Sequence, residues 1–102
     1  MIDKNTLVYI AVADFNGMTL VDYFLGNQSA STFFNDSYDD ILSYCVELVE
    51  DWIRNEGAFL DKKTAIDEKP YSYMRIKEVT PESLADEVYD YLANEQKETM
   101  RF

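Results

Sequence analysis

The first apolar segment of the chain has the character of a β-strand. Residues 6–15 read TLVYIAVADF and are rich in the β-branched and aromatic side chains that strands prefer. The segment runs into Asn16-Gly17, the dipeptide that most readily forms a two-residue hairpin turn. We therefore expect a hairpin with a return strand over residues 18–25. A short third strand is expected over residues 29–34, ending at Phe33 and Phe34.

Helical periodicity begins after Ser37. Apolar residues then recur at spacings of three and four, which predicts a helix with one broad apolar face made by Ile41, Leu42, Cys45, Leu48, Val49, Trp52 and Ile53. The Ser37 hydroxyl is suited to cap this helix, while Asp39 and Asp40 favour the positive end of its dipole. Gly57 is expected to end the helix.

The second half of the chain contains a connection, a strand and another helix. Residues 58–70 show no sustained period and are expected to form a long connection anchored by Phe59, Leu60 and Ile66. Alternation over residues 71–79 predicts a strand. Thr80-Pro81-Glu82 combines a capping hydroxyl, a proline at the first helical position and an acid in the first turn. A second helix should follow to about Gln96, with a frayed tail from about residue 97.

These elements predict one α+β domain over residues 1–102. Their order is β-β-β-α-β-α, with two helices packed on a small, mostly antiparallel sheet. A chain of 102 residues is long enough for one hydrophobic core and too short for two. Arg75 and Lys77 lie on the last predicted strand, and a homodimer through the edge of that strand is left open.

Charge and composition narrow the class of function. The chain has 9 Lys and Arg against 20 Asp and Glu, a formal net charge of -11, which repels phosphate backbones and favours a basic partner over direct nucleic-acid binding. There is no histidine and only one cysteine, Cys45, so the usual catalytic triads, zinc sites and disulfide frameworks lack their residues. No apolar run is long enough to span a membrane, and Leu7–Ala13 lacks the features of a signal peptide. A cytoplasmic protein without a cofactor is expected.

Carboxylates are the only side chains left for catalysis. Asp14, at the end of the first predicted strand, together with Glu47 or Glu50 of the first helix, resembles the carboxylate sets with which RNase H-like nucleases hold two divalent ions. However, an Asp next to a tight turn commonly bonds the backbone instead. We therefore expect a protein that is not an enzyme and that holds no metal.

Several local patterns resemble the HicB family of antitoxins, whose core is a truncated RNase H-like fold. The likeness spans about residues 6–92 and includes Leu7–Val12, the turn at Asn16-Gly17, and the return to Tyr23-Phe24. The acidic helix start at residues 35–42 and the stretch 48–53 with its Trp, followed by Glu56-Gly57, match best. The usual Asp-Leu-Pro-Gly turn is replaced by Phe24-Leu25-Gly26-Asn27. We expect no DNA-binding tail of the kind that many family members carry.

The resemblance implies a toxin-antitoxin system in which this chain neutralises a small basic ribonuclease toxin of the HicA type. Affinity would come from aromatic anchors and partner choice from charge. The candidate partner-binding residues are Tyr23, Phe34, Asp36, Tyr38, Asp39 and Asp40, with Phe33 beside them. The phenylalanines and the acids have a structural alternative, because the phenylalanines can seat the first helix and the acids can cap it.

The charge supports a second hypothesis equally well. A protein encoded by a phage or mobile element could mimic nucleic acid and so inhibit a DNA- or RNA-processing enzyme. A mimic needs carboxylates along an extended line at phosphate-like intervals, whereas an antitoxin needs a compact patch with apolar anchors. The sequence alone does not distinguish these two geometries.

Overall fold

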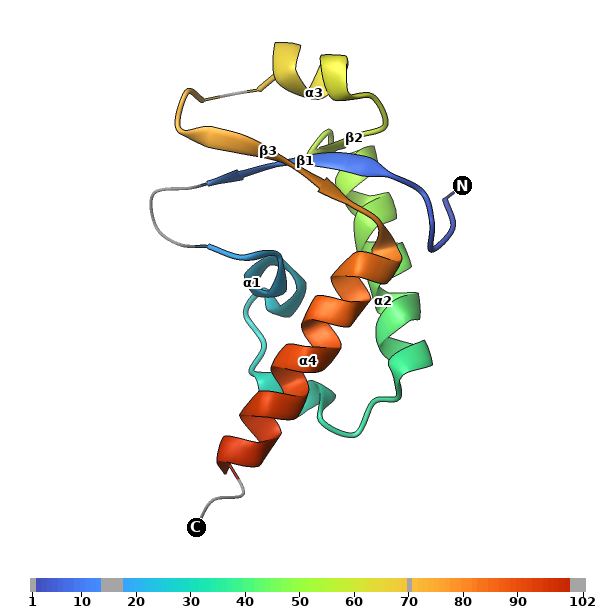
Figure 1. The fold of residues 1–102 in the computed structure, drawn as a ribbon, viewed down its shortest axis with the longest axis vertical. Coiled ribbons are helices and arrows are strands. Elements are labelled where there is room, and N and C mark those ends of the chain that lie inside the picture. The colour runs from blue at the N-terminus through green and yellow to red at the C-terminus, as the bar shows by residue number, and fades with distance from the viewer. Residues whose placement is uncertain (1, 14–17, 70, 100–102) are drawn as a thin grey trace.

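A three-stranded antiparallel sheet, in the order β2-β1-β3, separates two layers of helices (Figure 1). The computed structural model describes residues 2–13, 18–69 and 71–99. Along the chain its elements are β1 (Val8–Ala13), α1 (Leu20–Leu25), the 3₁₀ helix η1 (Ala30–Phe33), α2 (Tyr38–Arg54), β2 (Ala58–Phe59), α3 (Lys62–Asp67), β3 (Met74–Val79) and α4 (Pro81–Thr99). The short α3 covers one face of the sheet, and α1, α2 and α4 lie on the other. We call α1, η1, α2 and α4 the helical layer.

The central strand is β1, and its register with β2 and β3 shows which of its side chains enter the core. Val8 pairs with Val79 of β3, and Ile10 pairs with Ala58 of β2. All four of these side chains are buried. Because side chains alternate along a strand, Val8 and Ile10 point to the same face of the sheet. They join the core of the helical layer.

Helices α2 and α4 supply the rest of the core. Their buried side chains recur at helical spacing and comprise Ile41, Cys45, Val49, Leu84, Ala85, Val88 and Leu92. Burial disfavours the thiolate and raises the pKa of Cys45 to about 12. The single cysteine is therefore a small core residue and not a reactive thiol.

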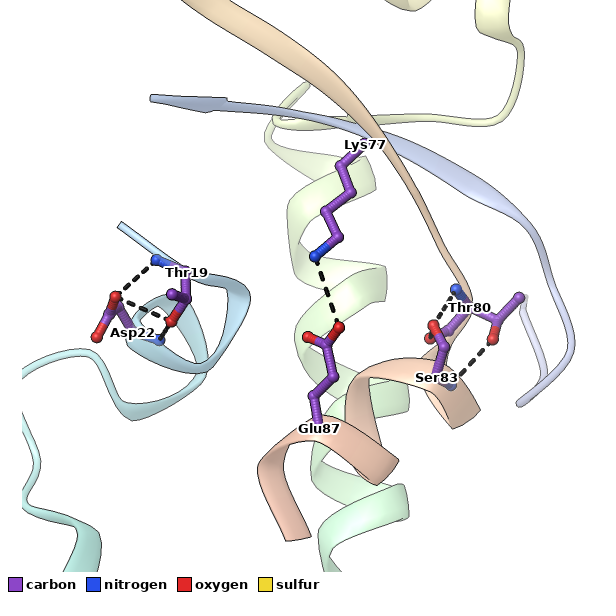
Figure 2. A network of polar contacts seen from close by, with 6 residues as sticks. All are labelled: Thr19, Asp22, Lys77, Thr80, Ser83 and Glu87. Carbon is purple, nitrogen blue, oxygen red and sulfur yellow. Dashed lines mark hydrogen bonds and ion pairs between the residues drawn. The ribbon is translucent and has the colours of Figure 1, made fainter. Parts of the chain in front are cut away.

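Side-chain caps set where the helices begin. In α2 the Ser37 hydroxyl accepts from the Asp40 amide at 3.2 Å, while the Asp40 carboxylate accepts from the Ser37 amide at 3.3 Å. The same reciprocal pattern joins Thr19 to Asp22 before α1 and Thr80 to Ser83 before α4 (Figure 2). Each capping box satisfies amides that have no partner inside the helix. The predicted caps at Ser37 and Thr80 are thus confirmed.

The predicted return strand over residues 18–25 is wrong, because these residues form α1. Both edges of β1 are already paired, one with β2 and the other with β3, so no edge is left for a hairpin partner. The Thr19–Asp22 capping box starts a helix there instead. The expected third strand over residues 29–34 is also wrong, since η1 occupies it. The proposed turn at Asn16-Gly17 lies outside the described residues.

Residues 58–70 are more ordered than a long connection. They contain β2 and α3, whose first turn is capped by Asp61, and hydrogen bonds from Thr64 lower the pKa of that carboxyl. Leu60 and Ile66, expected to anchor the segment, are exposed, whereas Ala58 and Ala65 are buried. Small side chains hold this segment because it lies directly against the sheet. Helix α4 continues to Thr99, past the expected end near Gln96.

The end of α2 differs from the prediction by one residue. Gly57 donates to the Trp52 carbonyl at 2.7 Å and Glu56 donates to the Ile53 carbonyl at 3.2 Å, which is the Schellman pattern. The left-handed residue in it is Glu56, with φ 60°, and not the glycine. A side chain thus occupies the position that usually favours glycine.

The predicted α+β class with a small antiparallel sheet is confirmed. The predicted order β-β-β-α-β-α is not, since the strands number three and helices replace the second and third predicted strands within the described ranges. Helices α1 and α3 add to the two that were expected. Among the described residues, no helix combines the length and the hydropathy needed to cross a bilayer.

Candidate protein-binding surface

The negative charge of the chain is concentrated on one side of the fold. Residues 5–53 contain eight acidic and no basic side chains, whereas residues 54–79 contain five acidic and six basic ones. The second range forms β2, α3 and β3, at the top of Figure 1. The described part of the first range forms β1, α1, η1 and nearly all of α2. The helical layer therefore carries most of the excess negative charge, and the sheet end is close to neutral.

Tyr38 links the two long helices at the surface of this layer. Its hydroxyl donates to Asp86 Oδ1 of α4 at 2.7 Å, and its ring makes an edge contact with Tyr89 at a centroid distance of 5.6 Å. The hydrogen bond to Asp86 raises the pKa of Tyr38 to about 12, because it stabilises the neutral phenol. Tyr38 is thus a tertiary contact as well as a candidate anchor.

Phe34 and Asp36 lie near Tyr38, between η1 and the start of α2. Both line a small cavity of about 70 Å³ whose other walls are Phe33 and the α4 residues Tyr89, Leu92, Ala93 and Gln96. Both side chains are partly buried. The structure therefore brings Phe34, Asp36 and Tyr38 together around Tyr89.

A larger groove between η1 and α2 shares Phe33 and Asp36 with this cavity. It has a volume of about 380 Å³ and is lined by Phe24, Gln28, Thr32, Phe33, Asp36, Tyr44 and Leu48. The Phe33 ring lies 5.0 Å from Phe24 and 6.1 Å from Tyr44, between centroids. Tyr44 is 45% exposed, so the groove opens to solvent beside the acidic face of α2. We call this cavity the aromatic groove.

The remaining candidates are placed differently. Asp40 is engaged in the capping box of α2, and Asp39 is exposed in the same first turn. Tyr23 packs edge-on against Trp52, with ring centroids 6.0 Å apart. Trp52 is separated from Tyr38 by fourteen positions of one helix, about 20 Å. Tyr23 therefore does not belong to the Phe34–Asp36–Tyr38 cluster.

Sequence reasoning missed four residues of this surface: Phe24, Tyr44, Asp86 and Tyr89. One signal was available for Tyr44, which lies on the polar side of the α2 pattern, four residues after Asp40 and three before Glu47. Aromatic side chains are enriched in protein–protein interfaces, so a tyrosine among the acids of a polar helix face indicates a candidate binding residue. The other three are defined by contacts between distant segments.

In the described part of the chain, no three acidic or cysteine side chains lie together in a way that could hold a metal ion. Asp14, the proposed partner of Glu47 or Glu50, lies outside the described residues. The surface does offer two aromatic-lined cavities that share Phe33 and Asp36, together with exposed acids on α2 such as Asp39, Asp40 and Glu47. Such a surface suits a basic protein.

Comparison of the chain with family models, with curated proteins and with solved structures finds no match in any of the three.

Proposed function

We propose that this chain is a non-catalytic, acidic protein-binding domain whose helical layer covers a basic surface of its partner. The observation that supports it is the one-sided charge, since residues 5–53 carry eight acids and no base. Opposite charge speeds encounter and rejects acidic competitors. The partly buried Tyr38 and the exposed Tyr44 and Tyr89 supply the amphipathic rings that binding surfaces favour.

The partner class we propose is a small basic ribonuclease, neutralised in the cytoplasm in the manner of an antitoxin. This choice comes from the HicB-like sequence patterns, whose best-matched part forms α2 and its capped start. The domain would cover the basic groove through which RNA enters the enzyme. Nucleic-acid mimicry is the competing function. The two aromatic-lined cavities that share Asp36 offer the apolar anchors that a compact binding patch needs and that a line of charges alone does not supply.

Affinity capture from the host lysate tests the proposal. Tagged protein is incubated with lysate at low salt and at about 0.5 M NaCl, and retained proteins are identified by mass spectrometry. A small basic protein that is retained at both salts, and whose ribonuclease activity is lost in the complex, supports the antitoxin function. A large nucleic-acid enzyme released by salt supports mimicry instead. If neither class is retained at either salt, the proposal is wrong.

A matched pair of charge variants then locates the interface. One variant neutralises three acids of the helical layer by Asp36→Asn, Asp39→Asn and Glu47→Gln. The control neutralises three acids near the sheet by Glu56→Gln, Asp67→Asn and Glu68→Gln, and so has the same net charge. Association with the captured partner should slow by roughly tenfold in the first variant and by much less in the control. Equal effects would place the interface elsewhere.

A further inference from the structure

Building on the proposed function, we propose that the aromatic groove is a specific site for an arginine side chain of the basic partner. Three aromatic rings and one carboxylate line this cavity, from α1, η1, α2 and the loop that precedes α2. The groove therefore exists only in the folded chain. It would anchor one cation, while the rest of the acidic surface acts at longer range.

The arrangement of the rings suits a flat cation. Phe33 meets Tyr44 at an interplanar angle of 73° and Phe24 at 52°, so the three rings are not parallel and form a corner. A cation over an aromatic face within about 6 Å of its centroid is attracted by the ring quadrupole. Arginine adds stacking, because its guanidinium is planar and weakly hydrated. A volume of about 380 Å³ admits this side chain with its aliphatic stem.

The carboxylate of Asp36 completes the site. Asp36 is only partly exposed, and within the described part of the chain its carboxylate forms no hydrogen bond or ion pair. By contrast, the Asp40 carboxylate accepts from the Ser37 amide, and the Asp86 carboxylate accepts from Tyr38. None of the described residues that line the groove is basic. A guanidinium in the corner would donate to Asp36 while its face lies on a ring.

The surroundings of the groove favour a cation over an apolar occupant. Asp40, Tyr44, Glu47 and Asp51 follow one another at spacings of four, three and four along α2, so they share one exposed stripe beside the opening. Only Asp51 in this stripe has a basic partner among the described residues, Arg54 at 2.7 Å. An apolar helix bound in the groove would place its apolar side chains next to these carboxylates, which is unfavourable. A basic segment would instead be attracted by them.

The test is an NMR titration of the whole chain with N-acetyl-arginine amide. Its matched control is N-acetyl-citrulline amide, which has nearly the same shape but no charge. We expect saturable shifts of the ring signals of Phe24, Phe33 and Tyr44 with a Kd on the order of millimolar for arginine, and at least about fivefold weaker binding for citrulline. N-acetyl-lysine amide should bind more weakly than arginine, because an ammonium cannot stack.

Two variants separate the site from the general charge. Asp36→Asn should weaken arginine binding by roughly threefold or more, whereas Asp39→Asn, which removes an equal charge outside the groove, should leave it nearly unchanged. Tyr44→Leu, at an exposed position, should also weaken binding without unfolding the chain. Shifts that do not saturate up to about 50 mM, or that are equal for arginine and citrulline, would overturn the site.

The result of the arginine titration is independent of the result of the capture experiment. Retention of a basic partner without arginine binding in the groove would reject the anchor and leave the proposed function in place. Arginine binding without any basic partner would support the site and reject the proposed function. Loss of partner binding in Asp36→Asn and Tyr44→Leu, but not in Asp67→Asn, would support both.

Discussion

At the scale of single residues, the contact between Tyr38 and Asp86 joins stability to the candidate surface. The hydroxyl of Tyr38 donates to the carboxylate across the α2–α4 contact, at 2.7 Å. Any partner that uses the Tyr38 ring as an anchor therefore meets a side chain already held in place. An ordered tyrosine loses little conformational entropy when it is bound.

Tyr38→Phe should lower the free energy of unfolding by about 1 kcal/mol or less at neutral pH, because one hydrogen bond to an exposed carboxylate is lost. Chemical denaturation at pH 7 measures this change. The ring contact with Tyr89 is retained by phenylalanine, so a loss of several kcal/mol would contradict the assignment.

The same substitution changes how stability depends on pH. The pKa of Tyr38 is about 12 in the folded chain and near 10 in the unfolded chain, so this group stabilises the fold fully below pH 10. As the pH rises from 10 to 12, the unfolded chain releases the proton first and the contribution is lost. The Tyr38→Phe variant should lose less stability than the parent over this interval. Phenolate absorbance during a titration checks the pKa directly.

At the scale of elements, the C-terminus of α2 contains a residue under backbone strain. Glu56 adopts φ 60°, a region that costs a side-chain residue free energy and costs glycine little. Glu56→Gly should therefore raise the free energy of unfolding by about 0.5–1 kcal/mol. Glu56→Gln removes the charge but keeps the strain, so it should have almost no effect. Gly57→Ala is a second control, since its added Cβ would lie 3.6 Å from the Trp52 carbonyl oxygen, an ordinary contact.

The N-terminus of α2 gives a complementary prediction. Ser37→Ala removes the hydroxyl that accepts from the Asp40 amide and should lower the free energy of unfolding by about 1 kcal/mol. Ser43→Ala is the matched control, because Ser43 is an exposed residue inside the helix where alanine is favourable. Urea denaturation of both variants measures the difference. Equal stability would show that the cap is not needed.

The elements also show where sequence patterns predict correctly. The apolar face of α2 and the caps at Ser37 and Thr80 were predicted because they depend on neighbours within one or two turns. The same local signal existed at Thr19 and Asp22, a capping pattern just before Leu20 and Val21. The prediction followed the Asn16-Gly17 turn signal instead, which indicated that these residues form a strand paired with β1. The two edges of β1 pair instead with residues 58–59 and 74–79, which are distant in the sequence.

At the scale of the whole molecule, the formal charge of -11 should weaken the fold at low ionic strength. Like charges repel one another across the helical layer, and salt screens them over about 10 Å at 0.1 M. We expect the Tm to rise by a few degrees between about 10 and 150 mM NaCl. Calorimetry at pH 7 measures this change in Tm. A fall in Tm with salt would show that the surface ion pairs, such as Lys77 with Glu87 at 3.5 Å, outweigh the repulsion.

The sequence by itself determined the α+β class, the absence of histidine chemistry, the acidic character and the extent of α2 and most of α4. It also predicted the strand β3, although β3 begins at Met74 and not at residue 71 as expected. These properties depend on composition or on residues close together in the chain. Only the tertiary structure decided that residues 20–25 form a helix, that Phe34, Asp36 and Tyr38 gather around Tyr89, and that Tyr23 lies apart. The physical reason is that sheet edges, grooves and contacts between helices join segments that no local spacing relates.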